Sequence, residues 1–241
     1  MPPLNIALSD LPLFNDLDPS EVARVAPAFG ARMFGRGDLI DQNGSNDGRA
    51  LLLVSGAVRL VRSGPEGRVV GIGLVEDGGL FGRLPFALTP ATERAEALSA
   101  AHAVAVATRD LERIALAYPR VGANLAALVT QRLAACELRL ASLAFQSVPA
   151  RLAGSLLELA DRYGRMTPRG VRIELRLTHG QLAEMASTTR ETLTKVAGWM
   201  RTQGMVTLAR TEIWIDDLAA IEAVARGDRQ MPGRGGMQAV A

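Results

Sequence analysis

The stretch LTHGQLAEMASTTRETLTKVAGWMRTQGMV, residues 177–206, decides how the C-terminal part of this 241-residue chain folds. Thr178, followed three residues later by Gln181, has the spacing of a capping box, in which side chains and backbone cap each other at a helix start. The residues that follow are apolar at helical spacing: Leu182, Met185 and Ala186. We therefore predict a short helix with one apolar face.

A second helix is predicted at residues 188–203. Thr188 and Glu191 repeat the capping-box spacing, and Gly204 is a typical helix stop. One stripe of this helix is apolar and is expected to point inward: Leu193, Val196, Ala197 and Met200. Two capped helices joined by a tight turn predict a helix-turn-helix.

The opposite face of the second helix carries the functional signal. Four polar residues share it near the helix N-terminus, at spacings of one, three and four: Arg190, Glu191, Thr194 and Lys195. In the DNA major groove, Arg or Lys suits guanine and Glu accepts from cytosine. A solvated, charged helix face is the alternative interpretation. The two capped helices favour DNA reading over it.

The same thirty residues resemble the helix-turn-helix of the cyclic-AMP receptor / fumarate–nitrate regulator (Crp/Fnr) family of bacterial transcription factors, with Thr188-Thr-Arg-Glu-Thr192 at the start of the recognition helix. The resemblance implies a homodimeric, sequence-specific regulator that binds a palindromic operator in double-stranded DNA and works with RNA polymerase. A cytoplasmic location is expected from the sequence itself, which shows neither a membrane span nor a secretory signal. Its implied base-reading residues are Arg190, Glu191 and Lys195, with Thr194 beside them and Thr178, Thr188 and Thr189 near phosphates. Lys195 stands where the family usually has arginine, and a single-point donor relaxes base discrimination there.

An antiparallel β-roll is predicted from Met33 to Thr108, where short β-rich runs alternate with glycine-containing turns. The runs are Leu51–Val54, Val58–Val61, Val69–Leu74 and His102–Ala107. The segment resembles the cyclic-nucleotide-binding β-roll of the same family at residues 37–40, 55–60 and 81–84. Before it, Asp18-Pro-Ser-Glu21 predicts the start of a short helix.

A long helix is predicted from Arg109 to Phe145, interrupted at Pro119. It carries an apolar stripe of nearly heptad spacing: Val121, Leu125, Leu128, Val129, Leu133, Cys136, Leu140 and Leu143. Such a stripe suits a helix that packs against its own two-fold copy, and by resemblance this is the family's dimerisation helix. Packing against the chain's own β-roll alone is the other possibility.

The chain is therefore predicted to be an α+β protein in four parts. We expect a sensor β-roll at residues 1–120, a dimerisation helix at 121–146, a winged helix-turn-helix DNA-binding domain at 147–226 and a disordered tail at 227–241. Within the third part, Pro149 opens a helix and residues 171–177 alternate as a strand. Residues 206–208 and 213–215 predict the hairpin wing, and residues 217–224 a final helix.

The effector site departs from the family's pattern. Cyclic-AMP-binding relatives carry a glycine-glutamate-leucine run, an arginine-serine pair about eleven residues later, and a threonine-serine pair that meets adenine. This chain has Gly82-Arg83-Leu84, Arg94-Ala95 and Cys136-Glu137 at those places. An acceptor has become a donor and a hydroxyl is lost, each at a cost of about 1–3 kcal/mol. We expect an effector other than cyclic AMP, or none.

Two ideas about this site follow from its charges. The cations Arg83 and Arg94 favour an anionic ligand, such as a cyclic dinucleotide or an organic acid. The alternative is that Arg83 points into solvent or pairs with Glu96 or Glu93, and that the pocket is empty. A regulator gated by a cyclic nucleotide or cyclic dinucleotide therefore stays open.

Composition excludes several classes of protein. A hydrophobic content of 48% with a net charge of only +2 indicates a folded, cored protein, and no apolar run approaches the roughly 20 residues of a membrane span. The single cysteine excludes an internal disulfide and a four-cysteine metal site. A cupin-like enzyme on the β-roll needs two or more histidines, and only His102 lies there. We expect no catalytic residues, no metal and no resident cofactor.

Overall fold

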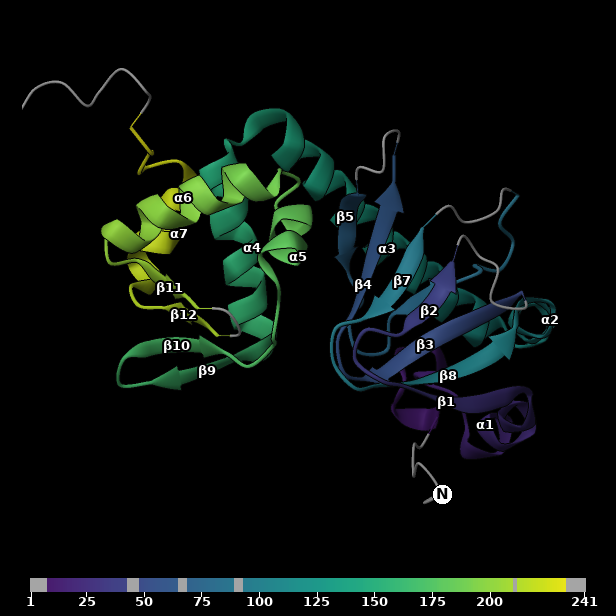
Figure 1. The fold of residues 1–241 in the computed structure, drawn as a ribbon. Helices are drawn as coiled ribbons and strands as arrows, with labels where there is room; N and C mark the ends of the chain where they lie inside the picture. The colour runs from purple at the N-terminus through teal and green to yellow at the C-terminus, as the bar shows by residue number, and fades with distance from the viewer. Residues whose placement is uncertain (1–7, 43–47, 65–68, 89–92, 210–211, 233–241) are drawn as a thin grey trace, which may run out of the picture. The chain divides into compact units, whose positions relative to one another are not determined.

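A computed structural model describes residues 8–42, 48–64, 69–88, 93–209 and 212–232 of the chain (Figure 1). The chain divides into two compact units, Met1–Leu138 and Arg139–Ala241. Within the described ranges, none of the helices has both the length and the apolarity that a membrane crossing requires.

The N-terminal unit is built on two antiparallel four-stranded sheets, as the β-roll prediction requires. One has the order β1-β8-β3-β6, with strands Phe29–Phe34, Ala101–Ala107, Arg49–Ser55 and Leu80–Gly82. The other has the order β2-β7-β4-β5, with strands Leu39–Gln42, Arg94–Ala97, Val58–Ser63 and Val69–Leu74.

Strand β3 explains how the roll is packed. Leu51 and Leu53 lie in one buried cluster with residues of β4 and β7, whereas Ala50 and Leu52 lie in a second cluster. Successive side chains of a strand point to opposite faces, so this strand is covered on both sides. That is why its sequence is continuously apolar rather than alternating.

Helices cover the second cluster. Four short helices precede the roll: η1 (Leu8–Asp10), η2 (Pro12–Phe14), α1 (Pro19–Val25) and η3 (Ala26–Ala28). Two helices follow it: α2 (Thr108–Ala117) and α3 (Pro119–Phe145). Asp18 and Glu21 form the capping box of α1. From α3, only the first turns are buried in this cluster, through Val121 and Leu125.

The C-terminal unit is a winged helix-turn-helix. Its helices are α4 (Val148–Tyr163), α5 (His179–Met185), α6 (Arg190–Thr202) and α7 (Leu218–Arg226). Its sheet has the order β11-β12-β10-β9, with strands Val206–Leu208, Ile213–Ile215, Gly170–Ile173 and Gly164–Thr167. The predicted wing hairpin is therefore β11–β12, whereas strand β9 was not predicted from the sequence.

Two predictions need correction here. The strand predicted at residues 171–177 is shorter: Ile173 pairs with Gly164, which directly follows helix α4, and the Glu174 N–H bonds the carbonyl of Tyr163, the last residue of that helix, so the strand pairing ends there. Leu175 and Leu177 are still buried, which is why the alternation continues. The predicted disordered tail also begins with ordered residues, since Asp228 N–H bonds the Ala223 carbonyl and Arg229 donates to Gln203 Oε1 at 2.8 Å. Residues 233–241 of that tail lie outside the described residues.

Candidate nucleic-acid interface

Helix α5 begins with the predicted capping box. The Gln181 N–H donates to Thr178 Oγ1 at 3.1 Å, and the Thr178 N–H donates to Gln181 Oε1 at 2.9 Å. Two backbone N–H groups at the helix start are thereby satisfied. The Thr178 side chain stays exposed, so it is accessible to a DNA phosphate while its oxygen serves as the cap.

The start of the second helix differs from the prediction. Thr189, not Thr188, is the N-cap of α6: its Oγ1 accepts from the Thr192 N–H at 3.2 Å. The Thr188 N–H instead donates to the Ala183 carbonyl at 2.8 Å and closes the turn. The predicted capping box between Thr188 and Glu191 is therefore wrong, and α6 runs Arg190–Thr202 instead of 188–203.

Ser187 shapes the turn between α5 and α6. It has φ 49°, in the left-handed region that favours glycine. For a residue with a Cβ this conformation costs roughly 1 kcal/mol or more. The end of α6 is conventional, because Gly204 takes the positive φ of 71° that a helix stop requires.

Helix α6 has one buried and one exposed face. Its apolar stripe is buried as predicted: Leu193, Val196, Ala197 and Met200. The predicted reading residues are all exposed: Arg190, Glu191, Thr194 and Lys195. The fold therefore holds the helix by one side and leaves its first two turns open to a ligand.

Two hydroxyls on or next to this face already make hydrogen bonds within the protein. Thr194 Oγ1 donates to the Arg190 carbonyl at 2.8 Å, one turn earlier in α6. Thr189 Oγ1 is engaged with Thr192 as the cap. Arg190 and Lys195 are thus the stronger donors on this face, because the Thr194 hydroxyl already donates to the Arg190 carbonyl.

Glu191 is held as a carboxylate. A hydrogen bond from its own backbone N–H lowers its pKa, the Thr189 hydroxyl lowers it further, and the cations of Arg190 and Lys195 act in the same direction. At neutral pH this group is therefore an acceptor only. An acceptor in the major groove matches the amino group of cytosine.

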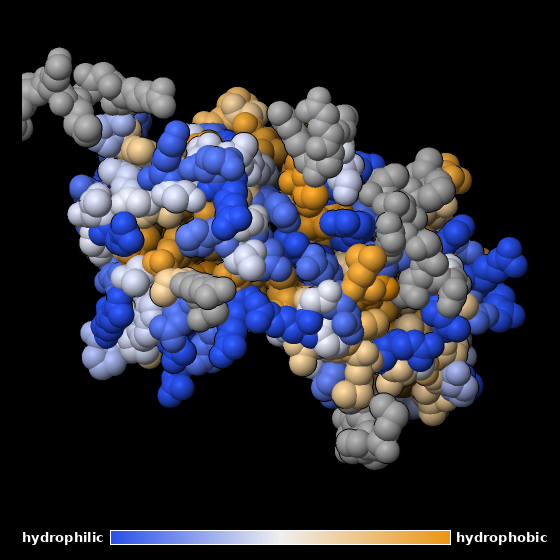
Figure 2. Space-filling model, viewed as in Figure 1, coloured by the Kyte–Doolittle hydropathy of each residue, from blue (hydrophilic) through white to orange (hydrophobic). Residues whose placement is uncertain are grey.

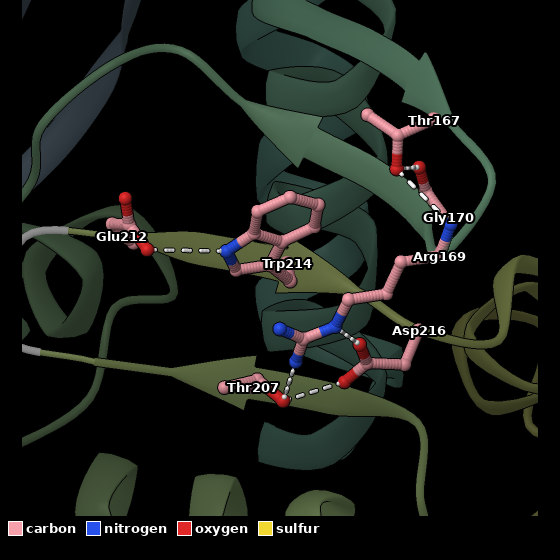
Figure 3. A network of polar contacts seen from close by, with 7 residues as sticks. All are labelled: Thr167, Arg169, Gly170, Thr207, Glu212, Trp214 and Asp216. Atoms are coloured by element: carbon pink, nitrogen blue, oxygen red, sulfur yellow. Dashed lines mark hydrogen bonds and ion pairs between the residues drawn. The ribbon is translucent and has the colours of Figure 1, made fainter.

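The wing is braced by a polar network on its sheet (Figure 3). Arg169 Nε donates to Asp216 Oδ1 at 2.9 Å, and its Nη2 donates to Thr207 Oγ1 at 2.7 Å. The guanidinium carbons of Arg169 and Arg172 lie 4.7 and 5.6 Å from the Trp214 ring centre. These contacts join the turn between β9 and β10 to strands β11 and β12. They therefore hold the β11–β12 wing in place within the sheet.

The residues expected at the effector site lie in the N-terminal unit. Gly82 ends β6 with φ 77°, and a Cβ there would meet the Arg49 carbonyl at 2.9 Å, so glycine is required. The Arg83 N–H donates to the Arg49 carbonyl at 2.9 Å, while the Arg83 side chain is exposed. Leu84 is half-buried. The backbone of this run is thus fixed by Gly82 and by the hydrogen bond to the Arg49 carbonyl.

The carboxylates that we considered as partners of Arg83 are engaged elsewhere. Glu96 binds Arg59, with Arg59 Nη2 2.6 Å from Glu96 Oε2, and this arginine is itself buried. Glu93 binds Arg132 of helix α3. Of the alternative that Arg83 points into solvent or pairs with Glu96 or Glu93, the structure shows an exposed side chain and neither pairing.

Arg94 lies on β7, the second strand of its sheet, followed by the buried Ala95. Among the described residues, Arg94 Nε and Arg132 Nη1 are buried nitrogens without a hydrogen-bond partner. Arg132 was not predicted from the sequence, although it stands one helical turn before Cys136. Cys136 and Glu137 are both exposed on α3 in the single chain.

Two further arginines were also missed. Arg139 and Arg151 donate to backbone carbonyls at residues 185–187, in the turn that precedes α6. No sequence motif marks them, because carbonyl groups are present at every residue. As for metals, the described residues contain no group of three His, Cys, Asp or Glu side chains that could hold an ion.

Comparisons with known proteins match both units. The family model of the cyclic nucleotide-binding domain matches residues 31–118, and that of the Crp-like helix-turn-helix domain matches residues 150–224. The chain is 30% identical over 200 residues to the CRP-like cAMP-activated global transcriptional regulator of Mycobacterium tuberculosis, covering 80% of this chain and 89% of that one. It is 31% identical over 226 residues to the cyclic AMP receptor protein of Thermus thermophilus, covering 90% and 97%.

Solved structures agree. A transcriptional regulator of the CRP/FNR family from Thermus thermophilus has a TM-score of 0.67 at 26% identity, covering 82% of this chain and 98% of that one. A cyclic-nucleotide-binding-like β-roll, a long helix and a winged helix-turn-helix together define a class of DNA-binding transcription regulators. The relatives are regulators and not enzymes, so the cupin-like alternative is set aside. The chain belongs to the Crp/Fnr family of transcription regulators.

Proposed function

We propose that the protein is a homodimer that reads a palindromic operator in double-stranded DNA with helix α6 in the major groove. The observation that carries this proposal is the division of α6 into a buried stripe and an exposed face of Arg190, Glu191, Thr194 and Lys195. A helix held in this way can approach base edges with its first turns.

Each residue then has a role set by its chemistry. Arg190 donates two parallel hydrogen bonds to guanine, Lys195 donates from a single point, and Glu191 accepts from cytosine. Thr178, Thr188 and Thr189 lie at the N-terminal ends of the two helices or in the turn between them, where backbone N–H groups favour phosphate. RNA polymerase is the expected protein partner on the DNA.

The dimer proposal rests on the second half of α3. Its apolar residues at heptad spacing are exposed in the single chain: Val129 by 41%, Leu133 by 57%, Leu140 by 68% and Leu143 by 41%. In the space-filling view, orange surface appears at the top, where Figure 1 draws the last turns of α3 (Figure 2). Leaving such a row in water is unfavourable, whereas a two-fold copy covers it. Packing against the β-roll alone accounts for Val121, Leu125 and Leu128 at the start of the row, and not for these four exposed residues.

Under this proposal, residues 1–120 form the sensor, 121–146 the dimerisation helix and 147–226 the DNA-binding domain. The two recognition helices of the dimer would address half-sites about one helical turn apart, roughly 34 Å.

The effector is proposed to be a molecule other than cyclic AMP, or none. Arg83 supplies a donor where a ribose hydroxyl needs an acceptor, and the nearby carboxylates Glu93 and Glu96 already bind other arginines. Buried side-chain nitrogens without a hydrogen-bond partner on Arg94 and Arg132 support an anionic ligand. Gating by a cyclic nucleotide or cyclic dinucleotide is the competing proposal, favoured by the match to the cyclic nucleotide-binding domain.

Selection of bound duplexes from a random DNA pool tests the proposed function. We expect enrichment of an inverted repeat whose half-sites are about one helical turn apart. Recovery of a pool with no enriched sequence would contradict sequence-specific binding, and enrichment of a single half-site would contradict the dimer.

A further inference from the structure

One guanidinium, that of Arg151 on helix α4, holds the turn of the helix-turn-helix. Its Nε donates to the Ala186 carbonyl at 3.0 Å, and its Nη2 donates to the Ser187 carbonyl at 3.2 Å. Arg139 donates to the preceding carbonyl, that of Met185. Three successive carbonyls at the end of α5 therefore accept from arginine side chains.

These carbonyls need such partners. The last carbonyls of a helix have no N–H partner within the helix, and a half-buried turn gives them limited access to water. The turn is also strained, because Ser187 has φ 49°. Charged donors at this point stabilise the conformation from which Thr189 starts α6.

The third nitrogen of Arg151 reaches a different segment. Its Nη1 donates to the Gln146 carbonyl at 2.8 Å. Gln146 lies directly after α3, and Ser147 next to it caps α4 by accepting from the Ala150 N–H at 3.4 Å. Two residues are thus all that connect α3 to α4, and Arg151 is bonded to one of them.

We infer that Arg151 is a positioning residue for DNA recognition, which ties the connection after α3 to the turn before α6. A planar, fork-shaped cation is suited to this task because it donates along three directions at fixed angles. Any change in how α3 ends is then passed to the residues that orient Arg190 and Glu191. This inference rests on the proposed DNA-binding function and adds to it the residue that links the end of α3 to the turn before α6.

The test compares two binding constants for each variant of the full chain. The probes are a duplex selected from a random pool by the wild-type protein and a duplex of equal length with a scrambled sequence. A smaller folded fraction weakens both constants equally, whereas a misplaced α6 weakens only the first, because scrambled DNA is bound through phosphates.

We expect Arg151→Ala to lower the ratio of specific to scrambled affinity by roughly tenfold or more, and Arg151→Lys to fall between it and the wild type, since lysine offers one point donor. Arg165→Ala is the matched control, because Arg165 is exposed on β9 in the same unit and only approaches Glu174 at 3.9 Å. It should leave the ratio unchanged.

Ser187→Gly in the Arg151→Ala background separates the turn from other causes. Glycine adopts a positive φ without the Cβ clash, so the double variant should regain several-fold of the lost ratio. The inference is overturned if Arg151→Ala keeps a ratio within about twofold of the wild type, or if Ser187→Gly restores nothing. A wild-type protein that selects no sequence would overturn the proposed function and this inference with it.

Discussion

Under the proposed function, Arg190 is the residue on which reading of the DNA sequence depends most. It is exposed as the first residue of α6 and is flanked by the cap Thr189. A bidentate arginine contact to guanine contributes about 1–3 kcal/mol of discrimination. We therefore expect Arg190→Ala to weaken binding to the selected duplex by roughly 10- to 100-fold, with little effect on scrambled DNA, in a mobility-shift assay at physiological salt.

Arg109→Ala is the control for that experiment. Arg109 is an exposed arginine on α2 in the other unit, so the charge change is the same and the position is different. Equal losses in the two variants would show that charge alone, and not a base contact, explains the effect.

Glu191 gives a prediction about pH. Its pKa is lowered by its own backbone N–H, by the Thr189 hydroxyl and by neighbouring cations. A lowered pKa in the folded state means that the carboxylate's contribution to stability is present above the unfolded-state pKa and is lost only as the pH falls through the folded value. Above that value the carboxylate is ionised and can accept from a base. Specificity should thus stay flat between about pH 5.5 and 8.5, measured at constant ionic strength.

The variant Glu191→Gln complements the pH measurement, because it removes the charge of the carboxylate and keeps its size. The amide can donate as well as accept, so preference at the base pair that Glu191 reads should relax while affinity for scrambled DNA stays the same or rises. A preference in the wild type that falls away between pH 7 and about 5.5 would contradict the ionised, hydrogen-bonded carboxylate.

At this scale, the sequence identified the exposed face but not the start of the helix. Thr188 and Thr189 are both good N-caps, and a glutamate three residues after Thr188 favoured the wrong one. The choice is made by the backbone: Ser187 turns left-handed, and the Thr188 N–H then bonds the Ala183 carbonyl. That bond depends on the shape of the turn, so no capping pattern contains it.

Among the elements, helix α3 offers a direct test of the dimer. Leu133 is 57% exposed and lies in the heptad row. A glutamate there would be buried without a partner in a two-fold interface, which is strongly unfavourable. We expect Leu133→Glu to convert the protein to a monomer at micromolar concentration in sedimentation velocity.

Leu116 supplies the matched control. It is 76% exposed on α2, outside the heptad row, so Leu116→Glu should leave the sedimentation coefficient unchanged. A wild-type protein that sediments as a monomer would remove the basis for the dimer, and with it the palindromic operator.

Elements with a strong local signal were predicted well, and elements defined by their neighbours were not. The strands β3, β4, β5 and β8 were expected from their β-branched and leucine-rich runs. In contrast, β7 reads Arg-Ala-Glu-Ala, which has no β propensity. It is a strand because β2 and β4 pair with it on both sides, and pairing partners distant in sequence cannot be read from four residues.

For the whole molecule, the proposed effector site separates the fold from the choice of ligand. The family assignment covers both units of the chain, whereas under the proposal the ligand depends on a few side chains of the β-roll and α3. The glycine run keeps its backbone, with Gly82 at φ 77°, while Arg83 and Ala95 stand where we expect an acceptor and a serine in cyclic-AMP-binding relatives. The proposal therefore predicts that ligand specificity can change without a change of scaffold.

Cyclic AMP should consequently fail to act on this protein. Three contacts that cyclic-AMP-binding relatives make are expected to be missing here, those of the glutamate, of the serine and of the threonine-serine pair. At about 1 kcal/mol each, the low end of the 1–3 kcal/mol range, their loss weakens binding by roughly two orders of magnitude. We expect no saturable heat with cyclic AMP in titration calorimetry, and the same operator affinity with and without it. A dissociation constant below about 1 μM, or roughly −8.2 kcal/mol, would show that Arg83 and Ala95 do not govern the site.

Restoring the two side chains turns this into a gain of function. Arg83→Glu with Ala95→Ser returns an acceptor for the ribose and a hydroxyl for the phosphate, and should raise affinity for cyclic AMP by at least about tenfold. Arg83→Ala with Ala95→Ser is the control, since it removes the cation without supplying the acceptor. If both double variants gain equally, the charge of Arg83 or the missing hydroxyl at residue 95 was the obstacle. If only the glutamate variant gains, the missing acceptor was the obstacle. If neither gains, residues 83 and 95 are not what excludes cyclic AMP, and the prediction is contradicted.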